Sequence, residues 1–156
     1  MINDAMITAL AALLGAVLGT SLNAHLTTRR ERWNLQRELY TRLLEHLSEA
    51  AHALELLYDT VLAGPGRSEK AENQWDVRRG KLSELESRAE EEIRRAASVA
   101  AIMLSDEAIK ALKGFQKEWN LSGQVESWGE HVSIRLDAAR KAYDVLVKAA
   151  KKDLAF

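Results

Sequence analysis

The chain has 156 residues, enough for one ordinary domain, and its charges nearly balance, with 22 Lys and Arg against 23 Asp and Glu. This balance argues against a general nucleic-acid binder, so no nucleic-acid partner is expected. Cysteine is absent, which excludes disulfides, thiolate nucleophiles and cysteine metal sites. Strong helix formers dominate, and β-branched and aromatic residues are few. The composition therefore predicts an all-α protein.

The N-terminal stretch Ala5–Leu26 contains no charged residue if His25 is neutral. As a helix it would be roughly 33 Å long at about 1.5 Å per residue, and the hydrocarbon core of a bilayer is about 30 Å thick. We therefore predict a membrane anchor over residues 1–28 that continues into a cytoplasmic helical bundle over residues 29–156. A cleaved secretion signal and a buried helix of a soluble bundle are the alternatives.

The order of charges around this stretch predicts its orientation. No Lys or Arg precedes residue 29, whereas a secretion signal has its basic residues before the apolar run. Clusters of Lys and Arg mark the cytoplasmic side of a membrane. We expect a single-pass protein of the cell membrane with its N-terminus outside and its C-terminus in the cytoplasm. The predicted membrane-surface residues, which we call the basic collar, are Arg29, Arg30, Arg32, Trp33 and Arg37.

Small residues recur along one face of the predicted anchor. Ala11, Gly15, Gly19 and Asn23 lie four positions apart, and the two glycines form a GxxxG motif. This spacing lets two membrane helices approach closely, so it favours a homodimer or higher oligomer that packs through the anchor. The alternative is a face of Ala and Gly that contacts only lipid.

Beyond the anchor, apolar residues recur at three- and four-residue spacing, which indicates a coiled-coil seam or the inner face of a bundle. Further apolar residues widen the stripe and favour a bundle over a two-stranded coiled coil. Gly64, Pro65 and Gly66 end this first helix. The predicted seam consists of Trp33, Tyr40, Leu43, Leu47, Ala50, Leu54, Leu57 and Val61.

Three more helices are expected after that turn. The second runs from about residue 71 to residue 104, with Leu85 on its inner face. The third starts at the sequence SDEA, where Ser105 would cap it, and the fourth starts near Val125 and includes Tyr143 on its apolar face. The third helix is short, so the body is either a three-helix antiparallel bundle with that helix as a cap, or a four-helix up-down bundle. Three tryptophans are expected in the core: Trp75, Trp119 and Trp128.

The search for chemistry finds no catalytic, metal-binding or cofactor-binding motif. Glu49 and His52 form a Glu-x-x-His pair, but bundle di-iron sites need two such pairs and two further glutamates. His46 and His52 are therefore interpreted as solvated or half-buried helix residues. The sequence AGPGRS lacks the lysine and spacing of a phosphate loop and is interpreted as a turn between helices.

The N-terminal third resembles a diffuse group of small actinobacterial membrane proteins with no assigned function. The resemblance covers about residues 5–50 and consists of the Ala/Gly/Leu segment, the sequence RRERW and the sequence LQRELYTRLLEHL. It implies a single-pass membrane protein and transfers no functional site.

Three functional hypotheses follow from these observations. The first is a non-enzymatic membrane-anchored helical module that scaffolds or recruits an unknown cytoplasmic protein. The second is a membrane-active effector or pore component that oligomerises through the anchor. The third is an enzyme or ligand sensor whose site has no sequence motif. An exposed apolar stripe on the body would favour the first, and a polar cavity inside the bundle the third.

Overall fold

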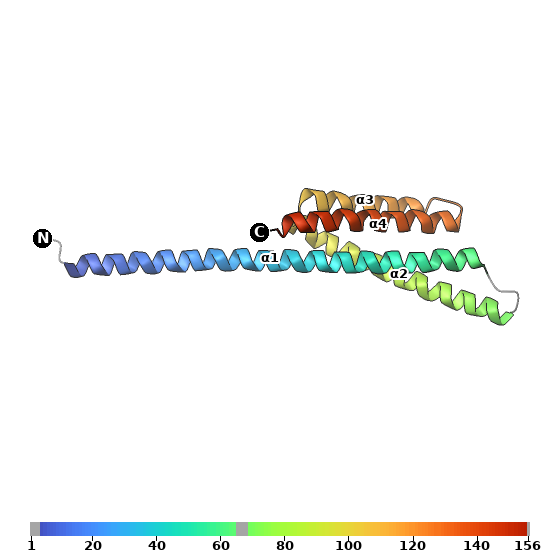
Figure 1. Ribbon diagram of the computed structural model, residues 1–156, viewed down its shortest axis with the longest axis horizontal. Helices are drawn as coiled ribbons and strands as arrows, with labels where there is room; N and C mark the ends of the chain where they lie inside the picture. The colour runs from blue at the N-terminus through green and yellow to red at the C-terminus, as the bar shows by residue number, and fades with distance from the viewer. Residues whose placement is uncertain (1–3, 65–68, 156) are drawn as a thin grey trace. The chain divides into compact units, whose positions relative to one another are not determined.

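The computed structural model describes the backbone of residues 4–64 and 69–155 and the side chains of residues 27–64 and 69–155. The described part contains four helices and no strand (Figure 1). This confirms the predicted all-α class and the helical bundle. The helices are α1 (Asp4–Ala63), α2 (Glu69–Met103), α3 (Asp106–Ser122) and α4 (Trp128–Asp153).

The chain divides into two compact units, residues 1–35 and residues 36–156. The first unit holds the N-terminal part of α1, whose described backbone is helical from Asp4 onward. The second unit holds the remainder of α1 together with α2, α3 and α4. This division separates two packing units, whereas the predicted division after residue 28 concerns the membrane and stays a prediction.

Within the second unit, the helices alternate in direction as an up-down bundle (Figure 1). The short α3 runs beside α4 as a member of the bundle and is not a cap across its end. The reason is the spacing of its apolar residues. Ala108, Leu112, Phe115 and Trp119 lie on one stripe along the helix, and all four are buried. A four-helix bundle with one short member is therefore the observed form.

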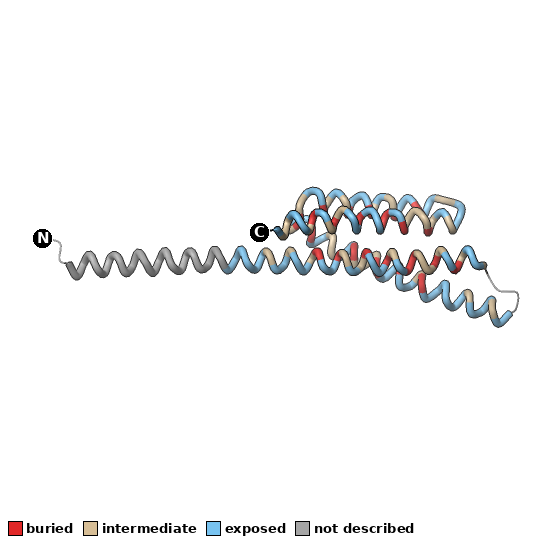
Figure 2. The backbone as a smooth tube through the Cα atoms, viewed as in Figure 1, coloured by how far each residue is buried: buried red, intermediate tan, exposed pale blue. Residues whose placement is uncertain are grey.

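The core follows the predicted seam closely in α1. Tyr40, Leu43, Leu47, Leu54 and Leu57 are each almost completely buried (Figure 2). Each other helix supplies one buried stripe. The core residues outside α1 and α3 are Leu82, Ala89, Ile93 and Ala100 of α2, Leu104 after it, and Val132, Leu136, Ala138, Ala139, Ala142, Leu146 and Ala149 of α4.

Three residues expected on inner faces lie instead at the surface. Leu85 is 54% exposed because Leu82 and Glu86 occupy the inner face of α2. Tyr143 is 37% exposed because its neighbour Ala142 takes the inner position of α4. Trp128 is 39% exposed because it is the first residue of α4, one turn before the first buried position.

The helix ends also differ in part from expectation. Ser105 precedes α3 in an extended conformation, but its side chain forms no capping hydrogen bond. The fourth helix begins at Trp128 rather than near Val125, since Ser127 caps it by accepting a hydrogen bond from the backbone N–H of Glu130. After α1, Gly64 has a φ of 66°, the left-handed conformation that glycine adopts most readily at a helix end.

Candidate interaction surface

The residues of the predicted basic collar lie on α1, and their membrane-surface role stays a prediction. Arg29, Arg30, Arg32 and Arg37 are exposed, and Trp33 is half-buried. The predicted anchor face of Ala11, Gly15, Gly19 and Asn23 lies outside the residues whose side chains the structure describes. Among those that it does describe, no helix contains an apolar stretch long enough to cross a bilayer.

His46 and His52 line a groove between α1 and α2. The His46 ring nitrogen Nδ1 lies 3.0 Å from a carboxylate oxygen of Glu49, and both side chains line the groove together with His52. Arg88 and Glu92 of α2 line the opposite wall. His46 is half-buried and His52 is exposed, as expected. In the described part of the chain, no three His, Asp or Glu side chains are grouped so as to hold a metal ion.

A buried polar cluster joins α2, α3 and α4, and the sequence analysis did not foresee it. Arg135 of α4 forms an ion pair with Glu86 of α2, whose side chain is only 6% exposed. The Arg135 Nε also donates a hydrogen bond of 2.9 Å to the Ser122 hydroxyl, and its guanidinium lies 4.6 Å from the centre of the Trp119 ring. His131 Nδ1 donates to the Ser122 carbonyl at 2.8 Å. Every charged group here has a partner, so the cluster fixes how three helices meet.

The sequence does carry a signal for this cluster. Glu86 interrupts the buried stripe of Leu82, Ala89 and Ile93, so a charged residue occupies an inner position of α2. A buried carboxylate requires a partner, because burial of an unpaired charge is very costly. Only the three-dimensional arrangement identifies Arg135 as that partner, 49 residues later in the chain.

A second polar cluster links the start of the bundle in α1 to the C-terminal end of α4. The Tyr40 hydroxyl of α1 donates a hydrogen bond to Asp153 of α4, and the backbone N–H of Ser105 donates to the same carboxylate at 3.2 Å. Gln36 donates to the Met103 carbonyl at 2.7 Å beside them. Burial and the Asp153 carboxylate both raise the pKa of Tyr40. Burial opposes the charge of Asp153, but the hydrogen bonds from Tyr40 and Ser105 outweigh it and lower the pKa of Asp153.

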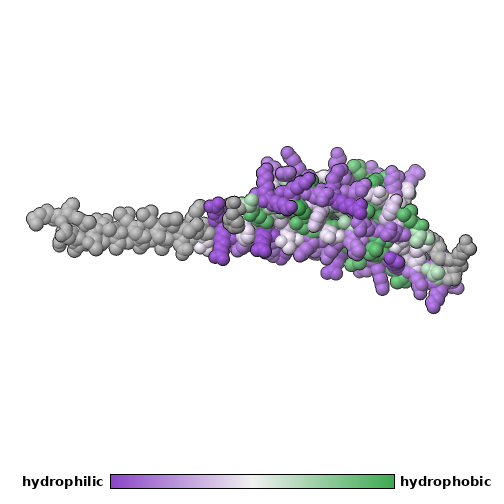
Figure 3. Space-filling model, in the orientation of Figure 1, coloured by the Kyte–Doolittle hydropathy of each residue, from purple (hydrophilic) through white to green (hydrophobic). Residues whose placement is uncertain are grey.

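Four large apolar side chains of α2 are exposed on a surface that is otherwise mostly charged. Val77 is 58% exposed, Leu85 54%, Val99 53% and Ile102 87%. Apolar patches also interrupt the hydrophilic surface of the bundle in the space-filling view (Figure 3). Exposure of apolar side chains to water is unfavourable, so their burial against a partner lowers the free energy.

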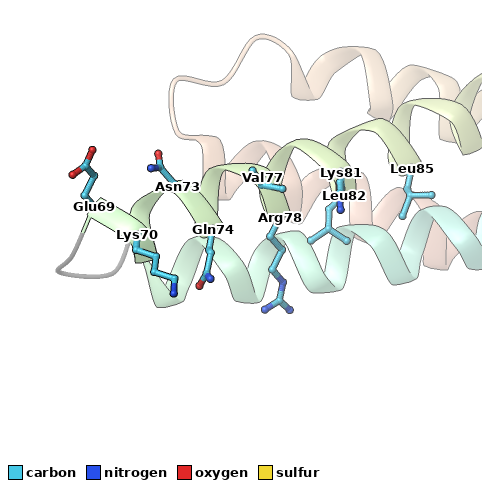
Figure 4. A pocket seen from close by; sticks show the side chains of 9 residues that line it. All are labelled: Glu69, Lys70, Asn73, Gln74, Val77, Arg78, Lys81, Leu82 and Leu85. Carbon is cyan, nitrogen blue, oxygen red and sulfur yellow. The ribbon is translucent and has the colours of Figure 1, made fainter.

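The N-terminal half of α2 borders an open groove of about 810 Å³. Val77, Leu82 and Leu85 supply its apolar lining. Lys70 and Arg78 extend from the same row of the helix as Leu82, so the groove has a basic rim (Figure 4). The lining also includes the carboxylate of Glu69.

Comparisons with protein-family models, curated proteins and solved structures find no match for this chain.

Proposed function

We propose that this chain is a non-enzymatic, single-pass membrane-anchored module that recruits or scaffolds a protein partner at the cytoplasmic face of the cell membrane. The observation that carries the proposal is the set of four exposed apolar side chains on α2: Val77, Leu85, Val99 and Ile102. A folded bundle that already buries its own core has no internal use for these side chains. Covering them would require a second surface.

The membrane part of the proposal is supported by the uncharged stretch Ala5–Leu26 and by the exposed arginines that follow it. The bilayer is thus one partner, and each arginine near an anionic lipid surface contributes about 1 kcal/mol. In the proposed topology, the N-terminus lies outside and the bundle lies in the cytoplasm.

The experiment is fractionation of cells that express either the full chain or a chain that lacks residues 1–28. The full chain is expected in the membrane fraction, and the truncated chain is expected to be soluble and helical, because residues 36–156 contain a complete core. A full chain that stays in the cytosol would disprove the anchor. Recruitment is tested by proximity labelling from the bundle: lysine substitution at Val99 and Ile102 should reduce labelling of specific neighbours, and unchanged labelling would contradict a role for this face.

A further inference from the structure

The outer face of α2 contains a row of residues spaced alternately by four and three positions. This is the spacing of the contact positions in a coiled coil. Seven members of the row are exposed, and the side chain of the eighth, Glu91, is 35% exposed. We call the row the outer seam; it consists of Val77, Lys81, Glu84, Arg88, Glu91, Arg95, Ser98 and Ile102.

The charges of the outer seam are arranged so that, when two copies of α2 run antiparallel, opposite charges face each other. If two copies of α2 run antiparallel about the midpoint between Arg88 and Glu91, Arg88 faces Glu91 of the second copy. In the same register Glu84 faces Arg95, and Val77 faces Ile102. Each of these contacts occurs twice, because a two-fold axis relates the copies. In a parallel, in-register pair, Arg88 would instead face Arg88, and like charges would meet at the five charged positions of the seam.

We propose that the partner of the α2 face is a second copy of this chain, bound through the outer seam in the antiparallel orientation. This rests on the proposed function, whose partner it names. Glu84 and Arg88 form no ion pair in the described part of the chain, so both are available for contacts between copies. Glu91 pairs within the helix with Arg94 and Arg95, and these exposed pairs exchange at little cost.

The seam is also long enough to be an interface. From Val77 to Ile102 it extends roughly 38 Å, at about 1.5 Å per residue. Leu85 and Val99 flank it and add apolar area. Because Gln36 hydrogen-bonds to the Met103 carbonyl near the C-terminal end of α2, the two bundles of the dimer would begin at opposite ends of the shared seam.

The test uses cysteine cross-linking of the full chain in lipid vesicles, since the natural sequence contains no cysteine. One preparation carries Val77→Cys and the other Ile102→Cys. Antiparallel pairing is expected to give cross-linked dimer only when the two preparations are mixed. Cross-linking of Val77→Cys with itself would indicate a parallel pair, and no cross-linking in the mixture would indicate no seam contact. Either result overturns the proposal.

Charge reversal gives the sharper control. With Arg88→Glu in both preparations, cross-linking should fall roughly tenfold, since two exposed attractions become two repulsions. Glu91→Arg in both should do the same. Mixing a chain that carries Arg88→Glu with one that carries Glu91→Arg should restore cross-linking, because opposite charges then face each other in both contacts. A change that acts only within one helix cannot be rescued by mixing, so failure of the rescue would also overturn the proposal.

A matched variant controls for net charge. Lys117→Glu reverses an exposed charge on α3, away from the seam, and should leave cross-linking unchanged. Circular dichroism checks that every variant remains helical. The failure of this proposal is distinguishable from failure of the proposed function: loss of seam contact in a chain that still fractionates with membranes disproves only the self-pairing. A chain that cross-links through the seam but stays in the cytosol disproves only the anchor.

Discussion

At the scale of single residues, the polar contacts inside the bundle matter most because they occur where charge is costly. Glu86 and Arg135 are paired in a poorly solvated place between α2 and α4. Such a pair is only weakly stabilising relative to apolar residues, but the loss of one member leaves an unpaired buried charge. The pair therefore specifies the packing of the helices more than it stabilises them.

We expect Arg135→Met to lower the free energy of unfolding by about 3–5 kcal/mol, because it leaves the Glu86 carboxylate buried and unpaired. The double variant Glu86→Leu with Arg135→Met should recover to within about 1 kcal/mol of the parent or exceed it. Urea denaturation followed by circular dichroism measures both. Equal losses in the single and double variants would show that the charge of Glu86 is not the cause.

The Tyr40–Asp153 pair predicts loss of stability at both ends of the pH range. The pKa of Asp153 is lowered by folding, so its contribution is present above the unfolded pKa of about 4 and is lost as the pH falls through the folded value. The pKa of Tyr40 is raised by folding, so its contribution is complete below the unfolded pKa of about 10 and is lost as the pH rises above it.

Tyr40→Phe tests this pair. At pH 7 it should cost roughly 1–2 kcal/mol, the value of a hydrogen bond to a charged group. Between pH 10 and pH 11 the stability of the Tyr40→Phe variant should decline less than that of the parent, because phenylalanine has no hydroxyl to lose a proton. Thermal melting across pH measures both effects. An identical alkaline decline in parent and variant would assign that decline to other groups.

At the scale of elements, the anchor predicted over residues 1–28 and the proposed contact face of α2 would have different physical tasks. Inside a bilayer, helices associate through close packing because lipid removes the hydrophobic driving force, so small residues determine the contact. In water, the proposed association through the outer face of α2 would depend on apolar burial and charge complementarity. The two associations would be energetically separate.

For the predicted anchor, Gly15→Ile and Gly19→Ile should reduce proximity between labelled anchors in vesicles, because each added side chain separates the helices. Leu13→Ile and Leu18→Ile are the matched controls and should have little effect, since those residues are predicted to face lipid or fill gaps. Energy transfer at several protein-to-lipid ratios measures the proximity. Equal association of the glycine variants and the parent would exclude this face.

At the scale of the whole molecule, the main prediction concerns orientation. Single cysteines at positions 2 and 156, labelled on intact cells with an impermeant reagent, should react at position 2 and not at position 156. The reason is the basic collar, which is predicted to keep its side of the proposed membrane segment in the cytoplasm. Labelling at position 156 alone would reverse the assignment.

The sequence by itself determined the helical class and most of the α1 core, since Tyr40, Leu43, Leu47 and Leu54 are buried where the seam predicts them. A repeat of 3.6 residues is local information, so it can be read without knowing any partner. The sequence also predicted the end of α1, because Gly64 and Pro65 disfavour a continuing helix.

Only the tertiary structure decided which of two neighbouring apolar stripes points inward. In α2 the inner position went to Glu86 and Leu82, which left Leu85 at the surface, and in α4 it went to Ala142 instead of Tyr143. The choice depends on the shape of facing helices and on partners distant in the chain, such as Arg135 for Glu86. For the same reason α3 became a full member of the bundle: its stripe of Leu112, Phe115 and Trp119 had a complementary surface to bury against, and the periodicity of one helix does not contain that surface.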